Sequence, residues 1–548
     1  MMTRRSTLIA RLDTQPFDLL VIGGGIVGAA IARDAAMRGL SVALVEQGDF
    51  ASGTSSKTSK LIHGGLRYLE QGHLRLVFEG LRERQTLRTI APGFVLPLEL
   101  MLPVFDGGRR PAWQVNAGLA LYDLLALGRR VRPHRMASAR RALRLEPRLR
   151  VDGLHAAGLY GDCLMDDARL CLATVLQAIR FQAVCCNYVR LRELLTAQGR
   201  VCGGAVEDRI TGRTYEVRAR AVVNAAGPWA DTIRRLSDAG AASRLAPTKG
   251  SHLLVPRVAD HTLFAEARAD GRMFFVLPWG EYSLVGTTER QVTQPLDALS
   301  AEPDEVGYLL EELNRLLPGS HIREDAVLAT YAGARPLLAH AGSATRASRE
   351  HRIEIDARGL VSVLGGKFTT HRLMAEHAVD LIAQTLRWRA ERCLTDQVSL
   401  LDESHPVLLD HWHALTRRTD PGQLAHWLAR YGVAAVRILH AIDRDATLGR
   451  PVCPHHDVVA AELLHAFEDE LACTLTDVLA RRTRIAWSSC QGLDLLSTAS
   501  ELMRRVGYDE TAVTEQVEAY QRFLADGLAF RPLLADSTAP AHAAGNTG

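Results

Sequence analysis

Near the start of the chain, apolar residues first form a continuous run and then recur at helical spacing. An apolar run at Leu19–Ile22 stops at a cluster of glycines, and apolar residues then recur at helical spacing over Ile26–Arg38. Gly39 stands where the C-cap of that helix is expected, and Ser41–Val45 is a second short apolar run. A run without polar alternation is typical of a strand that is buried on both faces in a parallel sheet. The pattern predicts a strand–helix–strand unit at the N-terminal end.

Two later segments repeat this arrangement. The apolar runs Ala221–Val223 and Leu360–Leu364 both lead into glycines, and helical patterns follow them at Trp229–Leu236 and Thr370–Thr385. Glycine-terminated strands that are so widely separated along the chain predict one sheet assembled from discontinuous segments. The stretches between these segments would then form a second domain.

The second domain is expected to contain a helix flanked by arginines and a sheet of its own. The helix is predicted over Trp113–Leu127, and strands are predicted at Leu253–Pro256, Met273–Leu277 and Ser283–Thr288. The flanking arginines are Arg109, Arg110, Arg129, Arg130 and Arg132.

After residue 390 the pattern is almost wholly helical. The last residues, 533–548, are poor in apolar side chains and are expected to be disordered. The helices of this region are predicted at Gln423–Arg430, Val458–Leu471, Thr476–Ile485 and Ala512–Leu528.

Composition and charge exclude some classes of protein. A chain of 548 residues is expected to form several domains, at ~150 residues each. The 65 Lys and Arg residues nearly balance the 62 Asp and Glu residues, and the net charge of +3 argues against a dedicated nucleic-acid binder. The 9 cysteines include no CxxC pair, and their odd number favours reduced thiols and a cytoplasmic location over a disulfide framework.

Neither a secretory signal nor a membrane-spanning helix is expected. The N-terminal apolar run, Leu8–Ala10, is shorter than the roughly 7–15 residues of a signal peptide. No stretch reaches the ~18 apolar residues that a spanning helix needs. The chain is therefore expected to be soluble or to lie on a membrane surface.

The strongest chemical motif is VIGGGIVG, in which Gly23, Gly25 and Gly28 fill the pattern GxGxxG between a strand and a helix. The first glycine permits a tight turn, the second lets the backbone approach a pyrophosphate, and the third lets helix and strand pack closely. Glu46 ends the following strand, where an acid accepts hydrogen bonds from a ribose. An acid in this place favours FAD or NAD over NADP.

The next segment distinguishes between these two cofactors. ASGTSSKTSKLIHGGLRYLE, residues 51–70, is rich in hydroxyl groups, glycine and basic side chains. Such a loop suits an extended cofactor to which it presents N–H and O–H donors, whereas an NAD domain normally continues with another regular strand–helix unit. The segment therefore favours FAD.

With these motifs the chain resembles the FAD-dependent glycerol-3-phosphate dehydrogenases, within the wider flavin fold shared with D-amino-acid oxidase. TSSKTSKLIHGGLRYLE and GGKFTTHRLMAEHA are the segments most specific to that family, and similar pieces extend from about residue 18 to 525. These pieces include GLYGDCLMDDARL, NAAGPWAD, PTKGSHLLVP, LPWGEYSLVGTTE, YAGARPLL and LTDVLARRTRIA. The implied fold class is α/β: a Rossmann-like FAD-binding domain of the D-amino-acid oxidase type, with an inserted α+β substrate domain and an all-α C-terminal domain.

The resemblance also implies domain boundaries. The FAD-binding domain is expected at 17–76, 151–248 and 335–390, and the substrate domain at 77–150 and 249–334. The helical domain is expected at 391–532, followed by the disordered tail 533–548.

By position, the resemblance implies four groups of residues that bind FAD non-covalently. One of these groups also has a physical reason of its own. After the third expected strand, the N-terminus of a helix with a lysine beside it would stabilise the negative charge near N1 and O2 of the reduced flavin. The ADP part is expected at Gly23, Gly24, Gly25, Ile26, Gly28 and Glu46; the pyrophosphate and flavin at Thr54, Ser55, Ser56, Ser59, His63, Gly64 and Gly65; a second dinucleotide contact at Ala226 and Gly227; and the pyrimidine end of the flavin at Gly365, Gly366, Lys367 and Thr369.

The implied reaction is the oxidation of sn-glycerol 3-phosphate to dihydroxyacetone phosphate by hydride transfer to FAD. A phosphate-bearing substrate calls for cationic donors with fork geometry, and Arg67 and Arg335 are the leading candidates. Tyr68, Lys249 and His252 are the next candidates for substrate binding.

The catalytic base is less well defined by the sequence. His252 is the leading candidate because histidine titrates near pH ~6.5, although a packed structural histidine fits the pattern equally well. His63, His371 and Lys367 compete with it.

Three questions stay open at this point. A quinone is the expected electron acceptor; the alternatives are an oxygen-dependent glycerol-3-phosphate oxidase, a related flavoenzyme that oxidises an amino or hydroxy acid bound through Arg335, or a flavin-binding protein without turnover. The basic segment 109–132 fits a membrane-surface helix and an ordinary core helix equally well, so peripheral attachment to the cytoplasmic face of the inner membrane stays open. Whether the chain forms a homodimer also stays open. VCPHHD, residues 452–457, has no convincing second ligand pair, so no metal site is expected.

Overall fold

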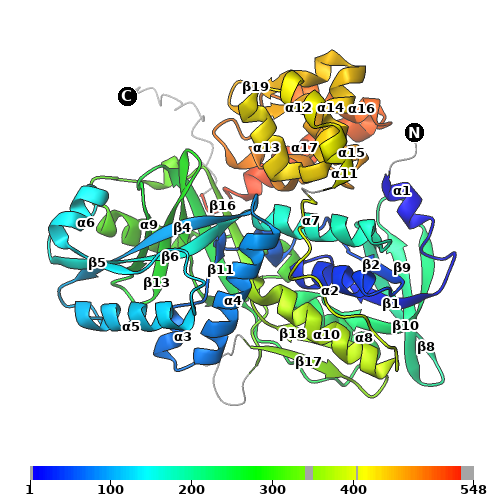
Figure 1. Ribbon diagram of the computed structural model, residues 1–548, viewed down its shortest axis with the longest axis horizontal. Coiled ribbons are helices and arrows are strands. Elements are labelled where there is room, and N and C mark those ends of the chain that lie inside the picture. Colours follow the sequence, from blue (N-terminus) through cyan, green and yellow to red (C-terminus); the bar gives the residue numbers. More distant parts are fainter. Residues whose placement is uncertain (1–3, 340–349, 403–404, 532–548) are drawn as a thin grey trace, which may run out of the picture.

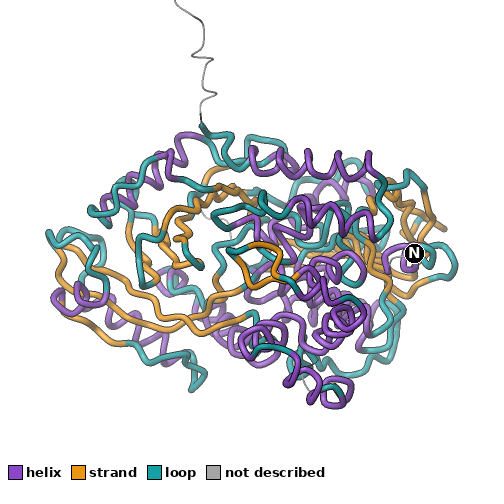
Figure 2. The backbone as a smooth tube through the Cα atoms, turned by 90° about the horizontal axis from the view of Figure 1, so that it is seen from above, coloured by secondary structure: helices purple, strands orange, loops and turns teal. Residues whose placement is uncertain are grey.

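The computed structural model describes residues 4–339, 350–402 and 405–531. The tail expected at 533–548 lies outside these residues. The described chain forms two sheets side by side, with a group of helices from the C-terminal part above them (Figure 1). Seen from above, strands lie to either side of a central group of helices (Figure 2).

The first sheet joins segments from three distant parts of the chain, as the strand pattern predicted. β1 (Phe17–Ile22) lies between β2 (Val42–Val45) and β10 (Thr214–Asn224), and all three strands are parallel. The strand order is β17-β18-β10-β1-β2-β7, and a β8–β9 hairpin extends from β10. The other strands are β7 (Val184–Cys186), β8 (Val189–Ala197), β9 (Arg200–Asp208), β17 (His351–Ile355) and β18 (Val361–Gly365).

Helices pack on the first sheet and enclose the largest hydrophobic core. Their apolar residues at helical spacing face the strands, which are apolar on both faces, so that the sheet interior excludes water. The helices are α2 (Ile26–Met37), α7 (Asp167–Arg180), α8 (Ala230–Ser237) and α10 (His371–Thr385). The parallel strands therefore end at one edge, where the glycine-rich turns gather.

The second sheet has the order β15-β11-β14-β13-β12-β4-β6-β3, with β16 beside β11 and β5 beside β6. Its strands are β3 (Leu61–Ile62), β4 (Val95–Phe105), β5 (Arg135–Ser138), β6 (Leu154–Met165), β11 (Thr248–Pro256), β12 (Thr262–Glu266), β13 (Met273–Trp279), β14 (Tyr282–Gly286), β15 (Arg290–Gln291) and β16 (Ala329–Arg335). Its helices are α3 (Arg67–Glu70), α4 (Leu74–Ile90), α5 (Ala112–Leu125), α6 (Ala139–Leu145) and α9 (Pro303–Leu316).

One predicted domain boundary places a whole strand in the wrong domain. The segment 151–248 was expected in the FAD-binding domain, but β6 at its start pairs with β4 from Leu154 to Met165 and belongs to the second sheet. β3, within 17–76, also joins that sheet. The short apolar pattern of β6 does not identify its partner strand, because pairing is decided by residues about 60 positions away in the chain.

The C-terminal part is helical, as predicted, except for one hairpin. The helix expected from Val458 begins at Ala460, because Val459 is still extended at the end of the short β19–β20 hairpin. The hairpin is β19 (Pro451–Cys453) and β20 (His456–Val459). The helices are α11 (Pro406–Asp410), α12 (Trp412–Arg418), α13 (Pro421–Tyr431), α14 (Ala435–Arg444), α15 (Ala460–Glu468), a π-helical segment (Asp477–Arg482), α16 (Leu496–Arg505) and α17 (Glu510–Asp526).

The N-terminal extension, which the resemblance did not cover, forms a further helix, α1 (Arg4–Ile9). Arg5 reaches the carboxylate of Asp208 at 2.6 Å and the carbonyl oxygen of Asn187 at 2.9 Å. The extension is therefore tied to the first sheet by a buried ion pair.

Candidate functional site

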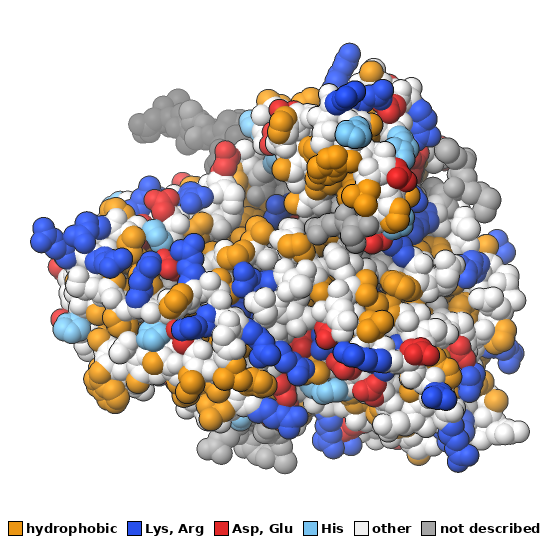
Figure 3. Space-filling view, in the orientation of Figure 1, with side chains coloured by type: hydrophobic (Ala, Val, Ile, Leu, Met, Phe, Trp, Pro, Cys, Tyr) orange, Lys and Arg blue, Asp and Glu red, His pale blue; other side chains and the backbone are white. Residues whose placement is uncertain are grey.

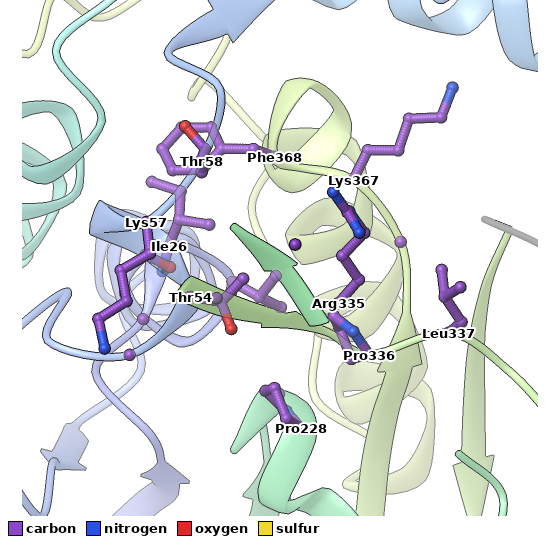
Figure 4. Close-up of a pocket in the computed structure, with 18 of the residues that line it drawn as sticks. Ile26, Thr54, Lys57, Thr58, Pro228, Arg335, Pro336, Leu337, Lys367 and Phe368 are labelled. Atoms are coloured by element: carbon purple, nitrogen blue, oxygen red, sulfur yellow. Dashed lines mark hydrogen bonds between the residues drawn. The ribbon is translucent and has the colours of Figure 1, made fainter. Parts of the chain in front are cut away.

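A cavity of about 1930 Å³ is bounded by residues of both sheets. It exceeds the roughly 300–1,000 Å³ of a site for one drug-sized ligand, so it has room for an extended cofactor together with a substrate. Figure 4 shows Ile26 and Thr54 on one side of it, and Arg335 and Lys367 on the other. The cavity thus opens where the parallel strands of the first sheet end.

The glycine motif forms a cradle that side chains would fill. Gly23 has φ +111°, and a Cβ at this position would lie 2.6 Å from the carbonyl oxygen of Ala225. A Cβ at Gly28 would lie 1.9 Å from the carbonyl oxygen of Gly23, so this glycine permits the close approach of α2 and does not line the cavity. Gly25 and Ile26 line the cavity, and the positive end of the α2 dipole faces it.

Glu46 lines the cavity directly after β2. Its carboxylate accepts the backbone N–H of Gly24 at 2.7 Å and that of Gly48 at 2.9 Å. Burial raises the pKa of Glu46, and the two N–H donors oppose that shift. The carboxylate is thereby held at the cavity wall, where it can accept hydrogen bonds from ribose hydroxyls. Gly24 does not line the cavity itself, and its backbone N–H anchors Glu46 from behind the cavity wall.

The hydroxyl-rich loop after β2 contributes most of its expected residues to the cavity. Ser55 Oγ accepts the backbone N–H of Ile26 at 2.9 Å and so fixes the loop against the start of α2. Ser56 and Gly64 are not among the lining residues: the Ser56 carbonyl accepts Lys60 Nζ, and Gly64 packs against Leu81. The loop residues that line the cavity are Thr54, Ser55, Ser59, His63 and Gly65.

The third glycine cluster ends β18. Gly365 and Gly366 have φ +74° and +90°, a region that favours glycine, and Lys367 and Thr369 follow at the start of the next helical turn. Lys367 Nζ lies 3.5 Å from the ring centroid of Tyr68. Ala226 and Gly227, after β10, also line the cavity. The described residues therefore fit an extended dinucleotide, and Lys367 places a cation at the wall of the same cavity.

Arg335 ends β16 and lines the cavity. Its Nη2 donates to Thr287 Oγ1 at 2.8 Å and to the carbonyl oxygen of Thr288 at 3.2 Å. The guanidinium lies directly over Gly250, where a Cβ would come within 2.2 Å of Nη2. A planar, permanently charged fork is thus held in place from two sides.

Arg67 belongs to a basic rim that sequence reasoning found only in part. It is half-exposed at the cavity, and its guanidinium lies 3.7 Å from the Glu289 carboxylate. Arg272 and Arg290 also line the cavity and were missed. Arg290 directly follows VGTTE, a segment of the family resemblance, and its position just after a strand end was the available signal.

Lys249 does not reach the cavity, so its prediction as a substrate ligand is wrong. Its ammonium group pairs with Glu302 at 2.6 Å and with Glu305 at 2.9 Å, beside α9. Side chains alternate along β11, and Thr248, Gly250 and His252 face the cavity while Lys249 faces the opposite side.

His252 is buried at the cavity wall. Its Nε2 lies 2.8 Å from Ser59 Oγ, and its ring stacks on Tyr331 with 4.9 Å between centroids. Burial, with Arg335 and Lys60 nearby, lowers the pKa of His252 well below its ordinary value. A neutral imidazole at neutral pH can accept a proton.

The competing histidines differ in position. His63 lines the cavity, but His371 does not: it is buried at the start of α10 and donates Nδ1–H to the carbonyl oxygen of Phe368 at 2.7 Å. Burial lowers the pKa of His371 to about 4. The prediction of His371 as a candidate base is therefore wrong, because its donor is committed to the helix start.

Comparisons with known proteins match nearly the whole chain. Residues 18–381 match the family model described as FAD dependent oxidoreductase, and residues 393–512 match the C-terminal domain of alpha-glycerophosphate oxidase. The chain is 37% identical over 533 residues to glycerol-3-phosphate dehydrogenase 2 of Mycobacterium tuberculosis, covering 94% of this chain and 89% of that protein.

Two further matches come from a distant organism and from a solved structure. The mitochondrial glycerol-3-phosphate dehydrogenase of Homo sapiens is 35% identical, over 95% of this chain and 75% of that protein. The structure of the glycerol-3-phosphate dehydrogenase from Bacillus halodurans complexed with FAD superposes with a TM-score of 0.80 at 27% identity, covering 97% of this chain and 99% of that chain.

Proposed function

The chain belongs to the family of FAD-dependent glycerol-3-phosphate dehydrogenases, and on this premise we propose that it oxidises sn-glycerol 3-phosphate to dihydroxyacetone phosphate with bound FAD. Membership confirms the resemblance and the expected FAD-binding fold. The observation that carries the substrate assignment is the basic rim, defined as Arg67, Arg272, Arg290 and Arg335, four arginines that line the same cavity.

A phosphate dianion suits this rim better than a single carboxylate does. An amino or hydroxy acid would need one fork, which Arg335 alone supplies, whereas several guanidinium groups that line one cavity suit a phosphate dianion, which shares its charge over three acceptor oxygens. The rim therefore favours a phosphate ester over the carboxylate substrates of the alternative flavoenzymes.

In the proposed reaction, FAD would supply, when bound, the acceptor for the hydride that leaves C2 of the substrate. Arg335 and Arg67 hold the phosphate and so fix the distance of C2 from the cofactor end of the cavity. The proton of the C2 hydroxyl moves to Ser59 Oγ while the Ser59 proton passes to His252 Nε2, across their 2.8 Å contact. Because burial and the nearby cations lower the pKa of His252, its imidazole is neutral at neutral pH, and Nε2 can accept the hydrogen bond of Ser59.

The test is an anaerobic titration of the purified flavin-bound protein. Glycerol 3-phosphate is expected to abolish the absorbance of the oxidised flavin, and a soluble quinone is then expected to restore it faster than oxygen does. Bleaching by an amino or hydroxy acid, but not by glycerol 3-phosphate, would refute the substrate assignment. Rapid turnover with oxygen would show that the protein is an oxygen-dependent oxidase and not a quinone-dependent dehydrogenase.

A quinone acceptor calls for contact with a membrane, and α5 presents a suitable surface. Among the described residues no helix is both long and apolar enough to cross a bilayer. Trp113 is 72% exposed, Leu124 67% and Leu127 63%, with exposed Arg109, Arg130 and Arg132 close by in the chain. Apolar side chains gather along the lower left edge of the molecule, beside basic ones (Figure 3). We propose that this surface lies on an anionic membrane.

The double substitution Trp113→Ser and Leu124→Ser is expected to weaken binding to vesicles that contain anionic phospholipid by at least about tenfold, because two large apolar side chains no longer enter the interface. Co-sedimentation with the vesicles measures it. The matched control is Leu409→Ser with Trp412→Ser, which removes exposed apolar side chains from α11 and α12. Equal losses in both variants, or none in the first, would contradict the attachment through α5.

A further inference from the structure

Three side chains that can bind a metal meet in the C-terminal domain, far along the chain from the flavin motifs. Cys453 and His456 lie on either side of the β19–β20 turn, and Cys490 comes from the loop after Trp487. One ligand atom from each lies within 4.8 Å of the other two. His456 Nε2 is 3.7 Å from Cys490 Sγ, and Cys490 also contacts Cys453.

The spacing of the ligands along the sequence and the distances between their ligand atoms both suit zinc. Cys453 and His456 are separated by two residues, the usual spacing of one half of a zinc site, and the fold supplies the third ligand that VCPHHD lacked. Zn–S and Zn–N bonds of about 2.3 and 2.0–2.1 Å put neighbouring ligand atoms of a tetrahedral site roughly 3.5–3.8 Å apart. The widest pair would need to close by at most about 1 Å on binding.

Both sulfur atoms are already placed as thiolate ligands would be. The backbone N–H of Gly492 lies 3.5 Å from Cys490 Sγ, and the backbone N–H of His455 donates to Cys453 Sγ. In each case the donor is two residues after the cysteine. Such donors stabilise a negatively charged sulfur and orient it toward a metal.

We propose that Cys453, His456 and Cys490 bind a zinc ion, with a water molecule in the fourth position. On binding, both thiols release their protons to solvent and His456 stays neutral. His456 Nε2, now 2.8 Å from Ser488 Oγ, turns its lone pair to the metal and carries its proton on Nδ1. Cys453 is buried while His456 and Cys490 are partly exposed, so that an ion can enter from solvent.

The metal would tie the β19–β20 hairpin, which Figure 1 shows in the C-terminal domain, to the loop that carries Trp487. Trp487 packs edge-on against Tyr331 with 5.9 Å between centroids, and Tyr331 stacks on His252. The proposed site therefore braces one side of the active cavity without touching it.

The test uses the full-length flavin-bound protein, purified with reductant and without chelator. The wild-type protein is expected to retain close to one zinc per chain after gel filtration, and Co²⁺ added to the zinc-free protein is expected to give thiolate-to-cobalt absorption. In Cys490→Ser and in His456→Gln, zinc content is expected to fall at least about tenfold. Cys202→Ser, which changes a partly exposed thiol in β9, is the matched control and should retain zinc.

Bound flavin shows that the cofactor-binding part of each variant is folded, because the cofactor cavity contains none of the three ligands. A chelator is expected to lower the melting temperature of the wild-type protein but not that of Cys490→Ser. Zinc-free wild-type protein without cobalt absorption, variants that bind zinc like the wild type, or a Cys453–Cys490 disulfide in the reduced preparation would each overturn the proposal.

Discussion

Replacing Arg335 by alanine is expected to lower kcat/KM for glycerol 3-phosphate by about 10²–10⁴-fold, because two hydrogen bonds to a charged phosphate are lost at ~1.5–3 kcal/mol each and a tenfold change corresponds to ~1.4 kcal/mol. Thr287 and Thr288 hold Arg335, so its guanidinium has a fixed place in the cavity wall. Steady-state kinetics with a soluble quinone measures the effect, and flavin content should be unchanged.

Two further substitutions separate charge from geometry. Arg335→Lys keeps the charge without the fork and should fall between the wild type and the alanine variant. Gly250→Ala leaves the guanidinium in the chain but displaces it, because the new Cβ would lie 2.2 Å from Nη2, so it should also lose activity. Arg192→Ala, on the exposed β8, serves as a control for the removal of an arginine. A kcat/KM for the alanine variant within about threefold of the wild type would exclude Arg335 from phosphate binding.

Local motifs were predictable because their chemistry depends on neighbours in sequence. Gly23 and Gly28 could be interpreted from GxGxxG alone, since the turn and the helix contact that they permit are formed within a few residues. The end of β18 was predictable for the same reason, because an apolar run leads directly into Gly365 and Gly366.

The side of a sheet that a side chain faces, and the strand with which a segment pairs, could not be predicted from these local patterns. Lys249 and His252 lie three residues apart on β11 and face opposite sides, but nothing in PTKGSH tells which side is the cavity until β14 and β16 pair with that strand. β6 was assigned to the wrong sheet because its partner β4 is distant in sequence. Cys490 could not be joined to Cys453 and His456 without the fold.

An ion-pair cluster around Asp49 joins the flavin domain to the C-terminal domain. Asp49 follows β2 closely and is buried, and two arginines of the π-helical segment contact it. Arg481, which is partly buried, places Nε 2.6 Å from Oδ2, and Arg482, which is buried, places Nη2 2.9 Å from Oδ1. Two guanidinium groups hold the pKa of Asp49 at about 2. Only two residues separate it from Glu46, so this contact supports the wall of the cofactor cavity.

The substitution Asp49→Asn is expected to destabilise the protein by about 3–5 kcal/mol, because Arg482 would stay buried without its carboxylate. Urea denaturation followed by flavin release and by tryptophan fluorescence measures it, and flavin should be released at lower urea. The matched control is Asp380→Asn: this half-exposed partner of Arg38 should contribute only ~0–1 kcal/mol. Similar midpoints for the two variants would show that the Asp49 cluster does not join the domains.

The same cluster predicts the direction of the pH dependence. The pKa of Asp49 is lower in the folded protein, about 2, than its ordinary value of 3.8, so its contribution is complete above about pH 4 and disappears as the pH falls through about 2. In that window the wild-type protein should lose stability more steeply than Asp49→Asn, because the amide cannot take up the proton that the folded carboxylate resists. If the stability of both proteins declines with the same slope between these two pH values, the Asp49 carboxylate is not the group that Arg481 and Arg482 keep ionised.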